Sequence, residues 1–221
     1  MIEVLVFDFD GVIIDSNKLK YDAFFQIFSS IPGSATTVKK ILNEHRERTR
    51  FFIIKEILLN LERQEKFVYS DMEDLITAYA NKYNEIAEEG AKGCNETLGA
   101  RTILEQLSKQ YALYINSTTP LDSLIRIVDK RSLKNLFKGI YGGPKTKLEN
   151  LSNILRVENI SPNEVVIIGD GKSDIEVATK FGCHFIGLRN EFNKFNNINF
   201  PLIEELSLLP EIINNLWAKD E

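Results

Sequence analysis

The segment FDFDGVIIDS, residues 7–16, directly follows the apolar run Val4–Val6 and carries the carboxylates of Asp8 and Asp10 two positions apart. In an extended chain, residues two apart face the same side, so both carboxylates point into one small volume. Gly11 then allows the chain to turn sharply. Like charges at this range repel each other, and burying them without a partner is costly. The pair therefore needs a partner that offsets its charge.

A run of hydroxyl side chains follows a second expected strand, residues 111–116. The run is Ser117, Thr118 and Thr119, and Pro120 comes directly after it. Hydroxyl groups and free backbone amides ahead of a helix can bind an anion such as a phosphate. The same run is also common at the start of an ordinary helix, so its meaning depends on what the other strand ends bring beside it.

Lysines and aspartates follow the next two expected strands. Lys145 and Lys147 stand near the start of an expected helix, where the helix dipole disfavours a cation and a fixed anion would compensate. Asp170 ends a strand, and Asp174 lies in the first turn of the next expected helix. Oxygen ligands of this kind suit a hard divalent cation such as Mg²⁺.

The elements that position these groups alternate between strand and helix. This alternation predicts an α/β fold, a Rossmann-like parallel sheet with helices on both faces. The expected strands are 1–8, 111–116, 139–141, 164–169 and 184–188, and the expected helices are 97–110, one after Pro120, 146–157, 173–181 and 210–217. Ligands bind beyond the carboxyl ends of such strands, so all four groups should meet at one edge of the sheet. Their charges balance if a metal and a phosphate complete the set.

Residues 16–93 have a different pattern, with helical spacing and no strand candidate. Three helices are expected, over 17–31, 50–61 and 70–89. The chain is therefore expected to form a Rossmann-like core from residues 1–15 and 94–221, with residues 16–93 inserted as a helical domain. The asparagine-rich stretch 190–199 is expected to be a surface loop.

Composition excludes several other classes of protein. A net charge of −5 and a pI near 5.3 argue against a dedicated nucleic-acid binder, which needs clustered basic residues. No apolar run approaches the roughly 20 residues that span a bilayer, so no membrane partner is expected. Cys94 and Cys183 are far apart and neither lies in a CxxC, and His45 and His184 are equally distant, so no disulfide framework or zinc cluster is expected. A cytoplasmic location is the default.

Taken together, the four groups resemble the signatures of the haloacid dehalogenase superfamily of hydrolases. In this sequence they read Asp8-Phe9-Asp10-Gly11, Ser117-Thr118, Lys147, and Gly169-Asp170 with Asp174. The helical insert lies between the first and second signatures, where the family's helical type 1 cap lies. The resemblance covers nearly the whole chain. It implies a Rossmann-like core under that cap and Mg²⁺-dependent phosphoryl transfer through an aspartyl-phosphate, as in the phosphoglycolate phosphatase-like branch.

The resemblance also implies roles for the four aspartates. Asp8 would be the nucleophile, and Asp10 would protonate the leaving alcohol and then activate water. Asp8, the backbone carbonyl of Asp10 and Asp170 would bind Mg²⁺, and Asp174 would be a direct or water-mediated ligand. Dehalogenases of the superfamily lack the second aspartate of the first signature. The presence of Asp10 therefore favours a phosphatase.

The phosphoryl group would be held by the second and third signatures. Ser117 would donate a hydrogen bond to it, and Thr118 is a candidate substrate contact. A lysine would neutralise the phosphoryl group and the nucleophile. Lys147 is the preferred residue, because it begins the helix KLENL as in the phosphoserine phosphatase branch, but Lys145 remains an alternative.

Specificity in this cap type usually comes from a loop between cap helices. The candidate is NEHRERTRFF, residues 43–52, where Arg46, Arg48 and Arg50 lie close together. Thr49-Arg50 resembles the Ser-Arg of cap motifs in related phosphatases and mutases, so Arg50 is the candidate contact for a substrate carboxylate or second phosphate. The alternative is a solvated helix face whose arginines pair with neighbouring glutamates.

The leading interpretation is a phosphatase acting on a small phosphorylated metabolite, with phosphoglycolate or a phosphosugar as plausible substrates. A sugar phosphomutase would use the same intermediate, but such mutases of the superfamily usually carry two adjacent acids where Gly169-Asp170 stands. A protein that kept the fold and lost the chemistry is the third possibility. The protein is expected to be a monomer or a small homo-oligomer.

Overall fold

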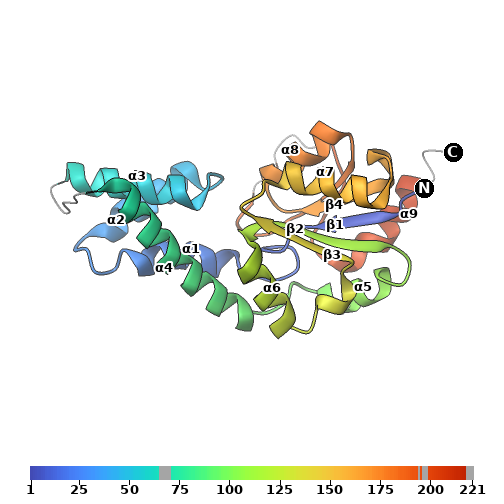
Figure 1. Cartoon of the computed structure of the whole chain (residues 1–221), viewed down its shortest axis with the longest axis horizontal. Helices are drawn as coiled ribbons and strands as arrows, with labels where there is room; N and C mark the ends of the chain where they lie inside the picture. Colours follow the sequence, from blue (N-terminus) through green and yellow to red (C-terminus); the bar gives the residue numbers. More distant parts are fainter. Residues whose placement is uncertain (65–70, 194, 196–198, 218–221) are drawn as a thin grey trace. The chain divides into compact units, whose positions relative to one another are not determined.

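The computed structural model describes residues 1–64, 71–193, 195 and 199–217 of the 221-residue chain. The chain divides into two compact units, one formed by Met1–Ser16 with Cys94–Glu221 and the other by Asn17–Gly93 (Figure 1). Cys94 and Cys183 are not joined by a disulfide. No helix in the described ranges is long and apolar enough to cross a membrane.

The first unit is built on a six-stranded parallel sheet, which confirms the predicted α/β class. The strands lie in the order β3-β2-β1-β4-β5-β6. They are β1 (Val4–Phe7), β2 (Ala112–Pro120), β3 (Gly139–Gly143), β4 (Val165–Gly169), β5 (His184–Leu188) and β6 (Leu202–Ile203). Every residue of β1 and β4 is buried, as expected for central strands covered on both faces.

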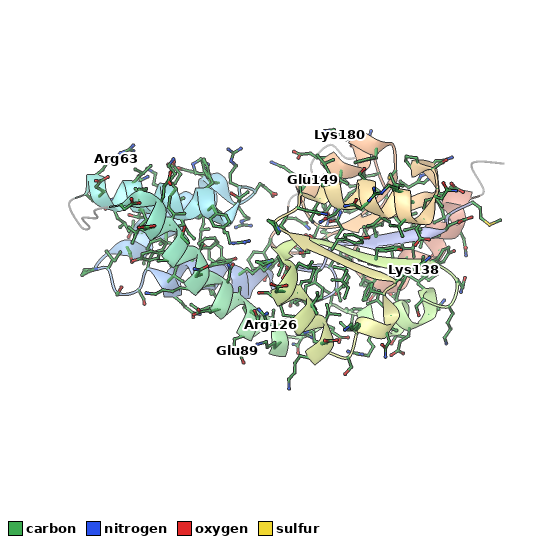
Figure 2. All side chains as sticks on the ribbon, viewed as in Figure 1. Arg63, Glu89, Arg126, Lys138, Glu149 and Lys180 are labelled. Atoms are coloured by element: carbon green, nitrogen blue, oxygen red, sulfur yellow. The ribbon has the colours of Figure 1, made fainter. Side chains whose placement is uncertain are left out.

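Helices cover both faces of this sheet, with α7 and α8 on one side and α5 and α6 on the other (Figure 1). They are α5 (Ala100–Leu107), α6 (Leu121–Lys130), α7 (Lys147–Glu158), α8 (Lys172–Phe181) and α9 (Leu209–Trp217), with short 3₁₀ turns at Lys134–Leu136, Pro162–Glu164 and Leu206–Leu208. Charged side chains such as Lys180 on α8 point outward (Figure 2). The opposite faces of α7 and α8 contribute Leu151, Ile154 and Val177 to the core beside the sheet.

The register of the central strands places the ends of β1, β2 and β4 side by side. Phe7 pairs with Ile115 of β2 and with Ile168 of β4, and the Asp8 amide donates a hydrogen bond to the Ile168 carbonyl at 2.8 Å. The strand order reverses between β1 and β4, because β2 and β3 extend one way from β1 while β4, β5 and β6 extend the other. Such a switch point is where α/β sheets bind ligands.

Two strands differ from the prediction. The strand expected over 111–116 continues to Pro120, with a register shift against β3 after Asn116. The hydroxyl run 117–119 therefore ends the strand itself and does not stand in a separate connection before a helix. The short strand β6 was not predicted, because two residues are too few to show an alternating pattern.

Within the described residues, the second unit contains four helices, α1 (Asn17–Ile27), α2 (Ser34–His45), α3 (Arg50–Arg63) and α4 (Met72–Gly93). Their apolar faces form a separate core that includes the stacked pair Phe28 and Tyr79, whose ring centroids are 4.5 Å apart. The start predicted for the last of these helices, residue 70, lies outside the described residues. The described helix begins after Asp71, whose carboxylate accepts hydrogen bonds from the amides of Glu73 and Asp74 at 2.8 and 3.0 Å.

Helix α2 was not among the predicted helices, and it corrects the start of the loop expected over residues 43–52, while the helix predicted from residue 50 begins there. Residues 43–45 end α2, and residues 50–52 are the first turn of α3, so only Arg46–Thr49 connect the two helices. Thr49 caps α3, because its hydroxyl accepts a hydrogen bond from the Phe52 amide at 3.3 Å. The stretch was misread because its charged residues resemble a solvated loop, while α2 is held by packing against α3.

Candidate active site

A buried ion-pair cluster lies at the switch point, centred on Lys147. The Lys147 ammonium is 2.9 Å from Asp8 Oδ2 and 2.7 Å from Asp174 Oδ1. The side chains are 5%, 12% and 3% exposed, respectively. The other oxygen of Asp8 accepts a hydrogen bond from the Phe9 amide at 2.7 Å. The lysine therefore joins the end of β1 to the first turn of α8.

Lys147 is the first residue of α7, and three hydrogen bonds fix the start of that helix. The Thr146 hydroxyl accepts from the Glu149 amide at 3.2 Å, and the Glu149 carboxylate accepts in return from the Thr146 amide at 2.8 Å. The Asn116 amide group at the end of β2 donates to the Lys147 carbonyl at 2.9 Å. Lys145 is exposed, so the structure places Lys147, and not Lys145, beside Asp8.

Burial and neighbouring charges shift the ionisation of both partners. Burial alone would lower the pKa of Lys147, but Asp174 and Asp8 outweigh it and raise that pKa. Burial raises the pKa of Asp174, and Asp8 and Asp170 raise it further, while Lys147 opposes them. Burial is the main cause of the raised pKa of Asp174, and the neighbouring carboxylates add to it.

The group that could hold a metal is Asp8, Asp170 and Asp174. One carboxylate oxygen from each lies within 4.8 Å of the others. When ionised, these side chains carry three negative charges against the single positive charge of Lys147. Three converging carboxylate oxygens with surplus negative charge are the donor set that Mg²⁺ prefers, so the residues present fit that ion. The Asp10 side chain does not belong to this group.

Asp10 instead accepts hydrogen bonds from two hydroxyl groups. Ser16 Oγ donates to Asp10 Oδ1 and Thr119 Oγ1 donates to Asp10 Oδ2, both at 2.7 Å. Gly11 adopts the positive φ of 76° that the sharp turn after Asp10 requires. Asp10 therefore has a different environment from Asp8, although both leave the same strand end.

The hydroxyl run of β2 is divided between buried and exposed positions. Ser117 is 1% exposed, and its hydroxyl accepts a hydrogen bond from the Thr119 amide at 3.1 Å. Thr119 is buried against Asp10, whereas Thr118 is exposed. Of the three, sequence reasoning gave a specific role to Ser117 and Thr118 and none to Thr119. Only the fold reveals the Thr119 contact, because its partner is 109 positions away.

Arg50, the candidate specificity residue, is the first residue of α3 in the second unit. Its guanidinium carbon lies 4.9 Å from the centroid of the Phe51 ring. Its Nε is buried and has no hydrogen-bond partner among the described residues. Arg46 and Arg48 lie over the rings of Tyr21 and Phe52, at 5.9 and 4.6 Å from the ring centroids.

Gly169, at the end of β4, makes room for Asp174. A Cβ atom at position 169 would lie 2.4 Å from both Cβ and Cγ of Asp174. We therefore expect Gly169→Ala to displace the Asp174 carboxylate, with a loss of about 1–3 kcal/mol in the free energy of unfolding from overpacking and about 100-fold or more in kcat/KM from misplacement of a site residue. Urea denaturation and steady-state assays measure the two effects.

Gly171 provides the matched control for this prediction. A Cβ atom there would meet Asp174 Oδ2 at 3.5 Å, an ordinary contact, and the backbone φ of −123° suits any residue. Gly171→Ala should retain most of the stability and activity. Equal losses of stability and of kcat/KM in the two variants would show that these losses do not come from the close packing of Gly169 against Asp174.

The chain matches the family model for haloacid dehalogenase-like hydrolases over residues 5–188. It is 25% identical over 195 residues to a phosphorylated carbohydrates phosphatase of Thermotoga maritima, which covers 83% of each chain.

Two solved structures illustrate how widely the fold is shared. A hydrolase of the haloacid dehalogenase-like family from Streptococcus pneumoniae superposes with a TM-score of 0.69 at 22% identity, covering 96% of this chain and 98% of the other. CbbY from Rhodobacter sphaeroides, solved in complex with phosphate, superposes with a TM-score of 0.72 at 16% identity, covering 95% and 96%. At these identities the likeness concerns the fold.

Proposed function

The chain belongs to the haloacid dehalogenase-like hydrolases, and on that premise we propose that it is a Mg²⁺-dependent phosphatase that hydrolyses a small phosphomonoester through an aspartyl-phosphate at Asp8. The observation that carries this proposal is the buried contact between Asp8 and Lys147 at the switch point, with Asp10 held separately two residues later. One edge of the sheet would thus supply Asp8 as the nucleophile, Lys147 as the cation beside the phosphoryl group, and Asp10 as the proton carrier.

Asp8 is the proposed nucleophile. One of its oxygens would attack phosphorus and form the acyl phosphate, while the alcohol of the substrate leaves. Lys147 stands 2.9 Å from the same carboxylate, so its ammonium would lie beside the transferring phosphoryl oxygens and offset their charge. Ser117, and Thr118 with its exposed position, would supply hydrogen bonds to the phosphoryl group or the rest of the substrate.

Asp10 is the proposed general acid and base. It would give a proton to the leaving alcohol, and the resulting carboxylate would then take a proton from the water that attacks the acyl phosphate. The hydroxyls of Ser16 and Thr119 hold both of its oxygens and so limit its rotation. The presence of Asp10 also favours a phosphatase over a dehalogenase, because dehalogenases of the superfamily lack the second aspartate of the first signature.

Asp8, Asp170 and Asp174 would hold Mg²⁺, together with the backbone carbonyl of Asp10. The ion would withdraw charge from the phosphoryl oxygens and offset the repulsion between the carboxylates. Asp174 already contacts Lys147, so this carboxylate would serve both cations.

A small phosphorylated metabolite is the proposed substrate. The relative from Thermotoga maritima is named for phosphorylated carbohydrates, so sugar phosphates are the first class to test, with phosphoglycolate beside them. Arg50, whose Nε lacks a partner among the described residues, is the proposed contact for a second anionic group. We propose a cytoplasmic location, and the absence of a disulfide between Cys94 and Cys183 agrees with a reducing compartment.

The proposed function predicts that the purified protein hydrolyses 4-nitrophenyl phosphate in the presence of Mg²⁺ and releases inorganic phosphate. Removing Mg²⁺ with EDTA should lower the rate by about 100-fold or more, since several kcal/mol of charge stabilisation are lost. Mg²⁺ at 100 times its dissociation constant should also add about 2.7 kcal/mol to the free energy of unfolding.

Product analysis with sugar phosphates separates this function from its alternatives. Release of inorganic phosphate supports the phosphatase. An isomerised sugar phosphate formed without phosphate release would instead identify a phosphomutase that uses the same intermediate. A protein that turns over neither 4-nitrophenyl phosphate nor any member of a phosphorylated-metabolite screen would have kept the fold without the chemistry.

A further inference from the structure

Two asparagines in the segment after β5 interlock through their side chains. Asn190 Oδ1 accepts hydrogen bonds from the amides of Phe192 and Asn193, at 2.9 and 3.1 Å. Asn193 Oδ1 accepts in return from the Asn190 amide at 3.2 Å. Such bonds between a side chain and the backbone two or three positions away stabilise tight turns. The four-residue turn thus holds both side chains in fixed orientations.

These bonds also decide which way each side-chain amide group faces. A backbone N–H can only donate, so the oxygen of each side chain must face it, and the NH₂ group must point the other way. Asn190 Nδ2 then donates to Asp170 Oδ2 at 2.8 Å. Asn193 Nδ2 donates to the Asp170 carbonyl at 3.1 Å and to the Leu188 carbonyl at 2.8 Å. The interlocked pair therefore holds both the side chain and the backbone of Asp170.

The sheet brings this turn to Asp170. Gly169 at the end of β4 pairs with Gly187 of β5, so the residues that follow the two strands leave the sheet side by side. Asp170 comes one residue after its strand and is half-buried. Its partners in the turn are separated from it by 20 and 23 positions in the chain.

We propose that Asn190 is a positioning residue for metal binding, which fixes the Asp170 carboxylate so that its other oxygen faces the cation, while Asn193 fixes the backbone beneath it. This inference rests on the proposed function, because it takes Asp170 as a ligand of Mg²⁺. In this proposal neither asparagine is a ligand of the cation or a contact of the substrate. Both act through Asp170.

An amide suits this position for an electrostatic reason. The cluster of Asp8, Asp170 and Asp174 already contains one cation, Lys147, and a second ammonium or guanidinium would cancel much of its attraction for a metal. A neutral N–H donor orients a carboxylate without reducing that attraction. Hydrogen bonds of this kind to metal ligands are typically worth 10- to 100-fold in metal affinity or activity.

The test measures metal binding directly. Mn²⁺ is titrated into the full-length protein without substrate, and free Mn²⁺ is followed by electron paramagnetic resonance, with Mg²⁺ added as a competitor. Asn190→Ala should raise the Mn²⁺ dissociation constant by about 10- to 100-fold. Asn190→Ser should show a similar weakening, because the shorter hydroxyl can still accept from the turn but cannot reach Asp170.

Asn153→Ala is the matched control. Asn153 lies on α7, and its Oδ1 accepts a hydrogen bond from Arg156 at 3.1 Å. Asn153→Ala therefore removes a side-chain amide from the same unit without changing a contact of Asp8, Asp170 or Asp174. This variant should bind Mn²⁺ as the wild type does. Melting temperatures in EDTA report any purely structural damage, since a structural role would lower the melting temperature and leave the Mn²⁺ affinity of the folded protein unchanged.

The outcomes distinguish this inference from the proposed function. If the wild type binds Mn²⁺ and the folded Asn190→Ala and Asn190→Ser variants bind it equally well, Asn190 does not position the ligand. If the wild type itself binds no Mn²⁺ or Mg²⁺, the metal site fails, and the positioning role fails with it. If Asn190→Ala does not fold, the result with Asn190→Ser decides.

Discussion

Replacing Asp8 with asparagine should reduce kcat for 4-nitrophenyl phosphate by about 10⁴-fold or more. The amide cannot form the acyl phosphate, and without that intermediate the other catalytic residues have no reaction to assist. The side chain keeps its size, and Lys147 keeps its contact with Asp174 at 2.7 Å. The substitution also removes one of several neighbouring negative charges. Without metal, the free energy of unfolding should therefore stay level or rise.

Asp15 offers the matched control for Asp8→Asn, because it is the third acid of the same segment. It is exposed, and neither the sequence nor the site geometry gives it a chemical role. Asp15→Asn should retain activity within about twofold, as surface substitutions usually do. Phosphate release measured on both variants decides the matter. Substantial activity in Asp8→Asn would exclude Asp8 as the nucleophile.

Asp10→Asn should have the second largest effect, and its size should depend on the leaving group. An alkyl phosphate needs a proton on its departing oxygen, so its hydrolysis should slow by about 10²–10⁴-fold, the usual contribution of a general acid or base. 4-Nitrophenolate leaves without a proton, so the first step should persist while the attack of water slows. The variant should then release a burst of about one equivalent of nitrophenolate per active site.

Rapid-mixing measurements of nitrophenolate against time test this expectation. The wild type, assayed with the same two substrates, is the reference for the leaving-group effect. Equal losses on aryl and alkyl phosphates, with no burst, would contradict a role for Asp10 in proton transfer. They would fit a purely structural role for its contacts with Ser16 and Thr119 instead.

The sheet and the positions of the strand ends could be predicted from the sequence, because buried parallel strands appear as short apolar runs. Asp8 and Asp170 lie beside each other since both follow such runs in neighbouring strands, as the topology of an α/β sheet requires. The choice between Lys145 and Lys147 depended on where α7 begins. The Thr146 cap places Lys147 in the first helical turn, where it is buried, and leaves Lys145 exposed.

Other features left a weak local signal in the chain, or none. Helix α2 carries Val38, Ile41 and Leu42 at helical spacing, but its polar and threonine-containing sequence has little intrinsic preference for helix, and packing supplies the rest. The contacts from Asn190 to Asp170 and from Thr119 to Asp10 join residues 20 and 109 positions apart. An asparagine-rich stretch is typical of a loop, and only the fold shows that Asn190 in it contacts Asp170.

The central claim is that Asp8 becomes phosphorylated, and trapping that intermediate tests it most directly. Asp10→Asn, incubated with 4-nitrophenyl phosphate and Mg²⁺, is quenched in acid and treated with borohydride, which reduces an acyl phosphate to an alcohol and releases the phosphate. We predict that peptide mass spectrometry finds Asp8 reduced to homoserine, and no such change when Asp8 is also replaced by asparagine. Nitrophenolate release without any reduction of Asp8, or with reduction at another carboxylate, would contradict the proposed mechanism.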